Sequence, residues 1–147
     1  GKGKDRKYLS TLINELKIED RVYLIGFQNK LSQFLKSCDF VIMPSRQEGM
    51  PNVVMESMAL GKPVLAANVN GVPELIEHEI SGYIFEPYKI DAIRNAMNYV
   101  MKKKDSSIIK NWGLKAQDHV KRNYTIDIML DNLESYFYQK INNSIRN

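Results

Sequence analysis

Two glutamates in the segment PSRQEGMPNVVME, residues 44–56, are the side chains best placed to do chemistry. The segment follows an apolar run and opens a helical pattern, so Glu48 falls in a loop and Glu56 about one turn inside a helix. A carboxylate at the position of Glu56 can accept a pair of hydrogen bonds from the diol of a ribose. Glu48 lies eight residues earlier, across the place where a diphosphate would sit.

The start of the same helix offers backbone groups to an anion. Gly49 lets the main chain approach a ligand closely, and Pro51 suits a helix start, where its missing N–H is not needed. The free N–H groups of Asn52 and Val53 would then point at the loop, and the helix dipole strengthens their attraction for a diphosphate. Taken alone, the two glutamates also fit a solvated loop residue and a partner of the helix dipole.

The elements that must position this segment form an alternating pattern. The expected strands cover residues 21–25, 39–43, 63–67 and 82–85. The expected helices cover residues 5–17, 31–37, 52–60, 72–77, 90–103, 106–121 and 126–141. Short apolar strands that alternate with helices predict an α/β fold, a Rossmann-like parallel sheet with helices on both faces. Residues 1–87 then form the α/β core, and residues 88–147 form C-terminal helices.

The beginning of the chain suggests that the sheet starts earlier. A parallel sheet that opens on a helix lacks its first strand, and Gly1 and Gly3 fit the turn after such a strand. We therefore expect at least one strand before residue 1, in a longer parent protein.

Composition excludes several classes of protein. The chain has 147 residues, of which 44% are hydrophobic and 26% charged, which is typical of one globular domain and not of a disordered chain. Its single cysteine excludes a disulfide framework and a cysteine-based zinc site. No apolar run approaches the roughly 20 residues of a membrane span. The net charge of +4 suits anionic partners, but no interleaved aromatic residues point to nucleic acid, so no nucleic-acid partner is expected.

The motifs around the glutamates follow one another in a fixed order. They are RVYLIGF at 21–27, MPS at 43–45, EGMP at 48–51, ESMALGKPV at 56–64, GVPE at 71–74 and SGY at 81–83. Together they closely resemble the C-terminal, donor-binding domain of glycosyltransferase family 4, the retaining glycosyl transferases group 1 of the GT-B fold. The resemblance covers residues 1–138 and is most specific over residues 21–85. The chain departs from the family at Asn70, where a glycine is usual, and at Ser57, where alanine is commoner.

The resemblance implies a role for each residue of the segment. Glu48 matches the glutamate that faces the donor sugar near its anomeric centre, and we assign it as the catalytic residue. It either steadies an oxocarbenium-like centre or holds sugar hydroxyls, which is the role we favour. Glu56 matches the glutamate that holds the ribose. The other implied donor-binding residues are Gly49, Met50, Asn52 and Val53 at the sugar and diphosphate, Gly26 and Phe27 near the nucleobase, and Gly3 at the cleft edge.

The implied function is that of one half of a retaining glycosyltransferase, with residues 1–147 as its nucleotide-sugar (donor) binding domain. The parent would transfer a sugar from a nucleoside diphosphate sugar, with a UDP-sugar favoured, to a glycan or lipid-linked acceptor in cell-surface polysaccharide synthesis. The acceptor domain and the family's phosphate-binding Arg and Lys would precede Gly1, so we expect the chain alone to be inactive.

The resemblance also bears on cofactors and location. No cofactor and no metal is expected if helix dipoles and cations stabilise the leaving diphosphate. A cytoplasmic location is implied, with peripheral association at the inner face of the membrane left open. Two alternatives are a non-catalytic nucleotide-sugar-binding module and a nucleotide-sugar epimerase of the same fold. The pairing of Glu48 with Glu56 argues against the epimerase.

Overall fold

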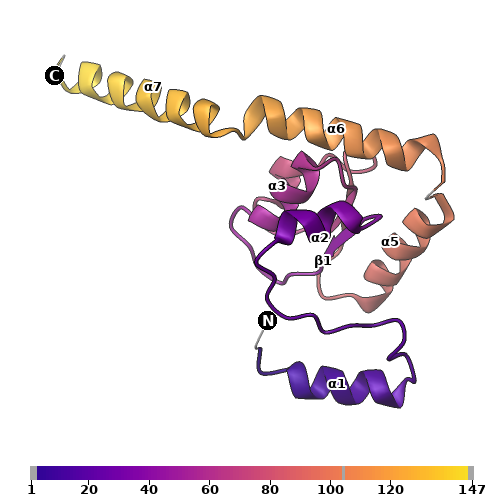
Figure 1. The fold of residues 1–147 in the computed structure, drawn as a ribbon. Helices are drawn as coiled ribbons and strands as arrows, with labels where there is room; N and C mark the ends of the chain where they lie inside the picture. Colours follow the sequence, from indigo (N-terminus) through magenta and orange to yellow (C-terminus); the bar gives the residue numbers. More distant parts are fainter. Residues whose placement is uncertain (1–2, 104, 146–147) are drawn as a thin grey trace. The chain divides into compact units, whose positions relative to one another are not determined.

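A computed structural model describes residues 3–103 and 105–145 (Figure 1). The described residues fall into two compact units, the first up to Leu31 and the second from Ser32 onwards. The strands are β1 (Val41–Met43), β2 (Val64–Ala67) and β3 (Tyr83–Phe85). The helices are α1 (Arg6–Glu15), α2 (Leu31–Ser37), α3 (Asn52–Ala59), α4 (Val72–Leu75), α5 (Ile90–Lys103), α6 (Ser107–Asn123) and α7 (Ile126–Ile145).

The first unit contains α1 and an extended segment, and here the expected strand at residues 21–25 is wrong. None of these residues pairs with another strand in the part of the chain that the structure describes. A strand exists only through ladder hydrogen bonds, and these backbone carbonyls meet side chains instead. The Arg6 guanidinium donates to the Leu24 carbonyl at 3.0 Å, and the Gln28 amide donates to the Ile25 carbonyl at 2.8 Å.

The second unit is built on a parallel sheet in the order β1-β2-β3. All four residues of β2 are buried, with exposures of 0–1%. Because successive side chains of a strand point to opposite faces, both faces of the sheet are covered at β2. Three of the four expected strands are therefore confirmed, together with the expected α/β fold that ends in helices.

The turn between α3 and β2 is fixed by the glycine that ends α3. Gly61 has φ +68°, a left-handed conformation that suits glycine. Its N–H donates to the Met58 carbonyl at 2.9 Å, and the Lys62 N–H donates to the Ser57 carbonyl at 2.9 Å. These two bonds form a Schellman motif, a common ending for a helix that glycine terminates. Gly113 of α6 lies against the Gly61 backbone so closely that a Cβ would not fit between them.

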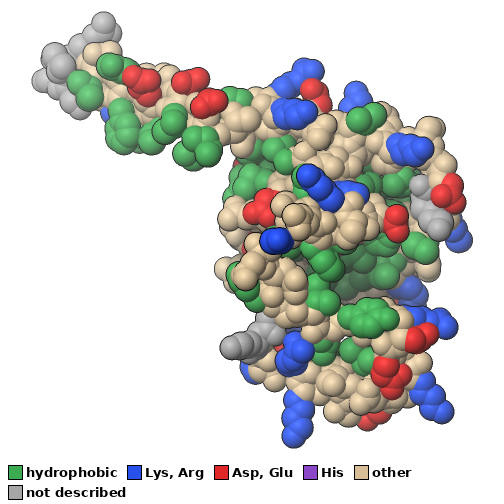
Figure 2. All heavy atoms as spheres, in the orientation of Figure 1, with side chains coloured by type: hydrophobic (Ala, Val, Ile, Leu, Met, Phe, Trp, Pro, Cys, Tyr) green, Lys and Arg blue, Asp and Glu red, His purple; other side chains and the backbone are tan. Residues whose placement is uncertain are grey.

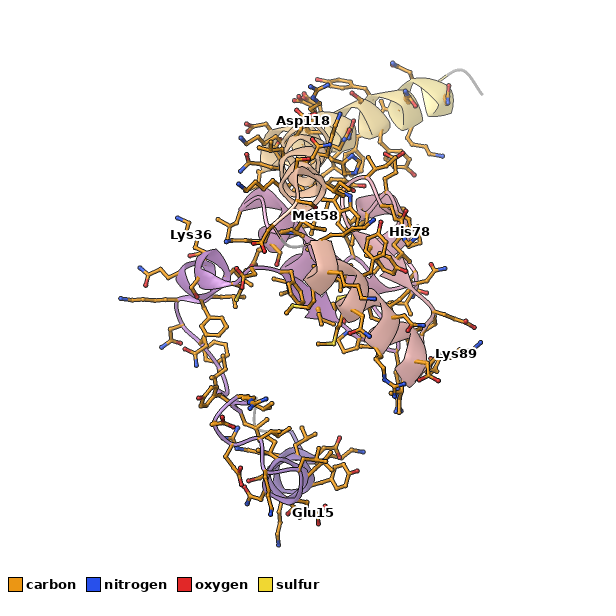
Figure 3. The ribbon with its side chains drawn as sticks, turned by 90° about the vertical axis from the view of Figure 1, so that its right-hand side faces the viewer. Glu15, Lys36, Met58, His78, Lys89 and Asp118 are labelled. Carbon is orange, nitrogen blue, oxygen red and sulfur yellow. The ribbon has the colours of Figure 1, made fainter. Side chains whose placement is uncertain are left out.

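The core of the second unit lies between the sheet and the helices α3, α5 and α6. Met58 of α3 is fully buried and points into the interior, whereas Lys36 and Lys89 point outwards (Figure 3). Trp112 of α6 is 2% exposed and stacks on Tyr99 of α5, with ring centroids 5.9 Å apart. Trp112 therefore packs in the core.

The last helix, α7, begins where expected. The Ile128 N–H donates to the Thr125 hydroxyl at 3.3 Å, so Thr125 is the N-cap of α7. None of the α7 side chains described is buried, and apolar residues line one edge of the helix (Figure 2). Over residues 3–103 and 105–145, no helix combines the length and the apolar character needed to cross a membrane.

Candidate functional site

Three loops meet at one edge of the sheet. Residues 44–51, 68–71 and 86–89 each follow a strand, and parallel strands end at the same edge. Hydrogen bonds join these loops to one another and to the end of β3. The Gly71 N–H donates to the Gly49 carbonyl at 3.1 Å, and the Asn68 N–H donates to the Phe85 carbonyl at 2.8 Å. The Tyr88 hydroxyl donates to the Arg46 carbonyl at 3.0 Å. The loop that carries Glu48 is thus held on both sides of that residue.

The contact between Gly71 and Gly49 leaves no space for a side chain. A Cβ on the buried Gly71 would lie 2.5 Å from the Gly49 carbonyl oxygen. The residue before it, Asn70, has φ +34°, which lies in the left-handed region. Asparagine tolerates this region better than most residues. Asn70 can therefore occupy this left-handed position.

The first turn of α3 leaves two backbone donors free. Pro51 is the N-cap and not the first helical residue, with φ −76° and ψ 109°. Its carbonyl accepts from the Val54 N–H at 3.0 Å and from the Met55 N–H at 3.3 Å. The N–H groups of Asn52 and Val53 have no acceptor among residues 3–103 and 105–145. These donors lie at the positive end of the helix dipole, where an anion is stabilised.

Both glutamates stand beside these donors in sequence. Glu48 is half-buried in the loop between its two anchored residues, Arg46 and Gly49, and Glu56 is exposed in the second turn of α3. Neither carboxylate makes a hydrogen bond or an ion pair within the described part of the chain. Gly49, Met50 and Asn52 are exposed as well. The segment therefore offers two unpartnered carboxylates and two free N–H groups to a ligand.

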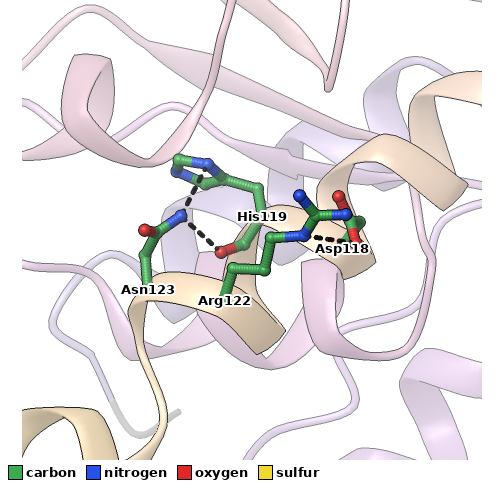
Figure 4. A network of polar contacts seen from close by, with 4 residues as sticks. All are labelled: Asp118, His119, Arg122 and Asn123. Atoms are coloured by element: carbon green, nitrogen blue, oxygen red, sulfur yellow. Dashed lines mark hydrogen bonds and ion pairs between the residues drawn. The ribbon is translucent and has the colours of Figure 1, made fainter.

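The short helix α4, which Gly71 precedes, is held in place by α6. The carbonyl of Glu74 accepts from the Tyr124 hydroxyl at 2.9 Å and lies 3.2 Å from His119 Nε2. Burial raises the pKa of the Tyr124 hydroxyl, and the nearby Glu74 carboxylate raises it further. Asn123 Nδ2 donates to the His119 carbonyl at 2.9 Å and lies 3.2 Å from Nδ1 of the His119 ring (Figure 4). The isolated His119 therefore has a structural partner.

The remaining predicted site residues lie in the first unit. Gly3 and Gly26 line one cavity of about 330 Å³, together with Asp5, Arg6, Leu9 and Leu24. Phe27 does not line this cavity, and its side chain is 84% exposed. The structure thus brings two of these three residues together.

The chain matches a known family over most of its length. The family model described as "Glycosyl transferases group 1" matches residues 1–119. The chain belongs to the glycosyl transferases group 1 family. The matched residues include the loop and helix that carry Glu48, Gly49 and Glu56.

Individual relatives in the comparison are longer than this chain. The chain is 28% identical over 138 residues to an N-acetyl-alpha-D-glucosaminyl L-malate synthase of Bacillus anthracis, covering 94% of the chain and 36% of that protein. It is 25% identical to a UDP-Gal:alpha-D-GlcNAc-diphosphoundecaprenol alpha-1,3-galactosyltransferase of Escherichia coli, covering 88% of the chain and 33% of the relative. The crystal structure of Anabaena HepE in complex with UDP matches with a TM-score of 0.80 and 28% identity. That match covers 90% of this chain and 36% of the solved one. The chain thus spans about a third of the length of these proteins.

Some residues of the candidate site are not evident from the sequence. Tyr88 follows Pro87 in no periodic pattern, and its contact with Arg46 crosses from the loop after β3 to the loop after β1. The φ of Tyr88 is +65°, a conformation in which glycine is usual and tyrosine rare. No group of three or more His, Cys, Asp or Glu residues in the described ranges could hold a metal ion.

Proposed function

We propose that this chain is the donor-binding domain, the C-terminal half, of a retaining glycosyltransferase of family 4. The parent enzyme transfers a sugar from a nucleoside diphosphate sugar to an acceptor hydroxyl. A UDP-sugar is the favoured donor, because Anabaena HepE, a structural neighbour, was solved in complex with UDP. The observation that carries the proposal is the loop and helix start at residues 44–56. There, two free N–H groups and two unpartnered carboxylates occupy the edge of the sheet where α/β proteins bind ligands.

The chemistry follows from the position of each group. When the bond between sugar and diphosphate breaks, negative charge builds on the diphosphate oxygens. The N–H groups of Asn52 and Val53, at the start of α3, stabilise that charge. Glu56 accepts hydrogen bonds from the ribose, and Glu48 holds hydroxyls of the donor sugar near its anomeric carbon. We propose that no metal is needed, because backbone dipoles here and cations elsewhere in the parent stabilise the diphosphate.

The acceptor belongs to the rest of the parent protein. One relative acts, by its name, on a sugar linked to diphosphoundecaprenol, which is a lipid-linked acceptor. We propose a glycan or lipid-linked acceptor for this chain's parent as well, in cell-surface polysaccharide synthesis on the cytoplasmic side of the membrane. We propose that the acceptor binds outside residues 1–147, and we therefore expect the chain alone to bind a donor weakly and to transfer no sugar.

Nuclear magnetic resonance titration with UDP-glucose tests donor binding by the chain itself. We expect the amide signals of Asn52 and Val53 to shift, with an affinity near −5 kcal/mol, roughly in the high micromolar range. The variant Glu56→Ala removes a charged acceptor worth about 1.5–3 kcal/mol, so its titration should show about tenfold weaker binding or none. Glu134→Ala, which removes an exposed carboxylate from α7, is the matched control. Signals that shift elsewhere while those of Asn52 and Val53 stay fixed would refute the proposed site.

A further inference from the structure

The excess positive charge of the chain is concentrated in one short stretch. Residues 102–122 contain seven Lys or Arg and two Asp, which gives the stretch a net charge of +5. The whole chain carries +4, so all other residues together have a net charge of −1. The stretch covers the end of α5 and nearly all of α6. Positive charge concentrated in one stretch produces a positive electrostatic potential near that stretch, which the net charge of the whole chain does not describe.

In α6 the charge lies on the face opposite the core. The buried face consists of Ile109, Trp112, Gly113, Ala116 and Val120. The exposed face carries four cations and two apolar side chains, which we call the basic face: Ile108, Lys110, Leu114, Lys115, Lys121 and Arg122. Basic side chains are visible along α6 in the space-filling view (Figure 2). Because the other side of α6 is packed on the core, the basic face is presented along the length of the helix.

Most cations of the basic face have no partner within the protein. Lys110, Lys115 and Lys121 make no hydrogen bond or ion pair with any residue in the described ranges. Arg122 pairs with Asp118 at 2.9 Å, which neutralises the acidic side chain on this side of the helix. Three lysines are thus free to meet anions outside the chain.

The apolar residues of the basic face indicate what kind of anion it meets. Leu114 is 66% exposed and Ile108 is 43% exposed, among the lysines. Helices that lie on membranes combine cations with apolar side chains that enter the boundary between headgroups and acyl chains. A surface that binds single-stranded nucleic acid uses exposed aromatic side chains for stacking. The aromatic residue of α6, Trp112, is buried instead.

We infer that the basic face of α6 docks on a lipid surface with anionic headgroups. The lysines meet the headgroup phosphates, and Leu114 enters the apolar boundary. The inference rests on charge and exposure and not on the proposed donor site. It gives the parent enzyme a contact with the membrane through its donor-binding half.

Vesicle cosedimentation tests this inference with the chain as it stands. The vesicles contain either phosphatidylcholine alone or equal parts of phosphatidylcholine and phosphatidylglycerol. Each lysine near an anionic surface strengthens binding about fivefold. The double variant Lys115→Glu/Lys121→Glu should therefore bind anionic vesicles at least about thirtyfold more weakly. Lys4→Glu/Lys7→Glu makes the same change in net charge on exposed residues of the first unit and serves as the control.

The outcomes separate a defined face from general basicity. We expect binding to anionic vesicles only, a large loss in the α6 variant, a small loss in the control, and weaker binding as salt rises. Circular dichroism of each variant verifies that the fold is kept. Equal losses in both variants, or equal binding to the two kinds of vesicle, would overturn the inference. Tighter binding to a duplex oligonucleotide than to anionic vesicles at the same salt concentration would also overturn it. UDP-glucose titration of the α6 variant should match the wild type in every case, so this test leaves the donor site untouched.

Discussion

Substitution by alanine should affect stability at one glycine of the candidate site and ligand binding at another. In Gly71→Ala, the new Cβ meets the Gly49 carbonyl oxygen at 2.5 Å. In Gly49→Ala, the new Cβ meets nothing within 4 Å. Both positions lie in the region that we propose for donor binding. Gly71→Ala should therefore destabilise the fold, whereas Gly49→Ala should leave stability unchanged and act on the ligand.

The size of the first effect follows from the geometry. Atoms of this kind do not approach closer than 3.0 Å, so Gly71 and Gly49 must separate by at least about 0.5 Å. Overpacking of this kind costs about 1–3 kcal/mol. The hydrogen bond between the Gly71 N–H and the Gly49 carbonyl weakens too, with a net worth of about 0.5–1.5 kcal/mol. We expect Gly71→Ala to lower the free energy of unfolding by about 1.5–4.5 kcal/mol in total.

Urea unfolding, followed by Trp112 fluorescence, measures this difference, because Trp112 lies in the core. Gly49→Ala should unfold within about 0.5 kcal/mol of the wild type. Titration with UDP-glucose should then show weaker binding by Gly49→Ala, since its Cβ occupies space on the side that we assign to the ligand. Equal unfolding midpoints for the wild type and Gly71→Ala would refute the close contact. Unchanged UDP-glucose affinity in Gly49→Ala would refute the proposed approach of the ligand to this backbone.

Three further predictions follow from the packing and the site. Gly113→Ala should destabilise the chain by about 1–3 kcal/mol, because a Cβ would clash with the Gly61 backbone; a urea midpoint equal to that of Leu114→Ala on the exposed side of α6 would contradict this. Since the pKa of Tyr124 is raised in the folded chain, its contribution to stability is present below about pH 10 and is lost as the pH rises through the raised pKa. Urea midpoints measured at increasing alkaline pH should therefore fall less steeply for Tyr124→Phe than for the wild type, and parallel curves would exclude this role. In the parent enzyme, Glu48→Gln should lower turnover much more than UDP affinity, and equal losses of both would remove Glu48 from the sugar subsite.

The sequence predicts the second unit well because its signals are local. Gly61 ends α3, Thr125 starts α7, and the apolar runs of β1, β2 and β3 are long enough to show buried strands. Residues 21–25 carry the same kind of apolar run, yet they form no strand. A single strand has no stability of its own, and its formation depends on a neighbour that the local sequence does not specify.

In the candidate site, too, short motifs predict the local features, whereas contacts between residues far apart in the sequence are not predicted. The free N–H groups at Asn52 and Val53 follow from a helix start, which a short motif reveals. The bond from Tyr88 to the Arg46 carbonyl joins residues 42 positions apart, and the brace from Tyr124 to Glu74 joins residues 50 positions apart. Neither contact repeats along a helix or strand, so the periodicity of the sequence does not predict it.

The exposed position of α7 has a consequence for how unfolding is measured. Helices in proteins owe most of their stability to the face that they bury, and among the described side chains of α7 only Ile128 is even partly buried. The opening of α7 is therefore expected to be a local equilibrium with a small free energy, independent of the core. Far-ultraviolet circular dichroism sums all helices and will begin to change before the fluorescence of Trp112 does. The two probes should give transitions that do not coincide, and only the fluorescence will report the cooperative unfolding of the sheet and its helices.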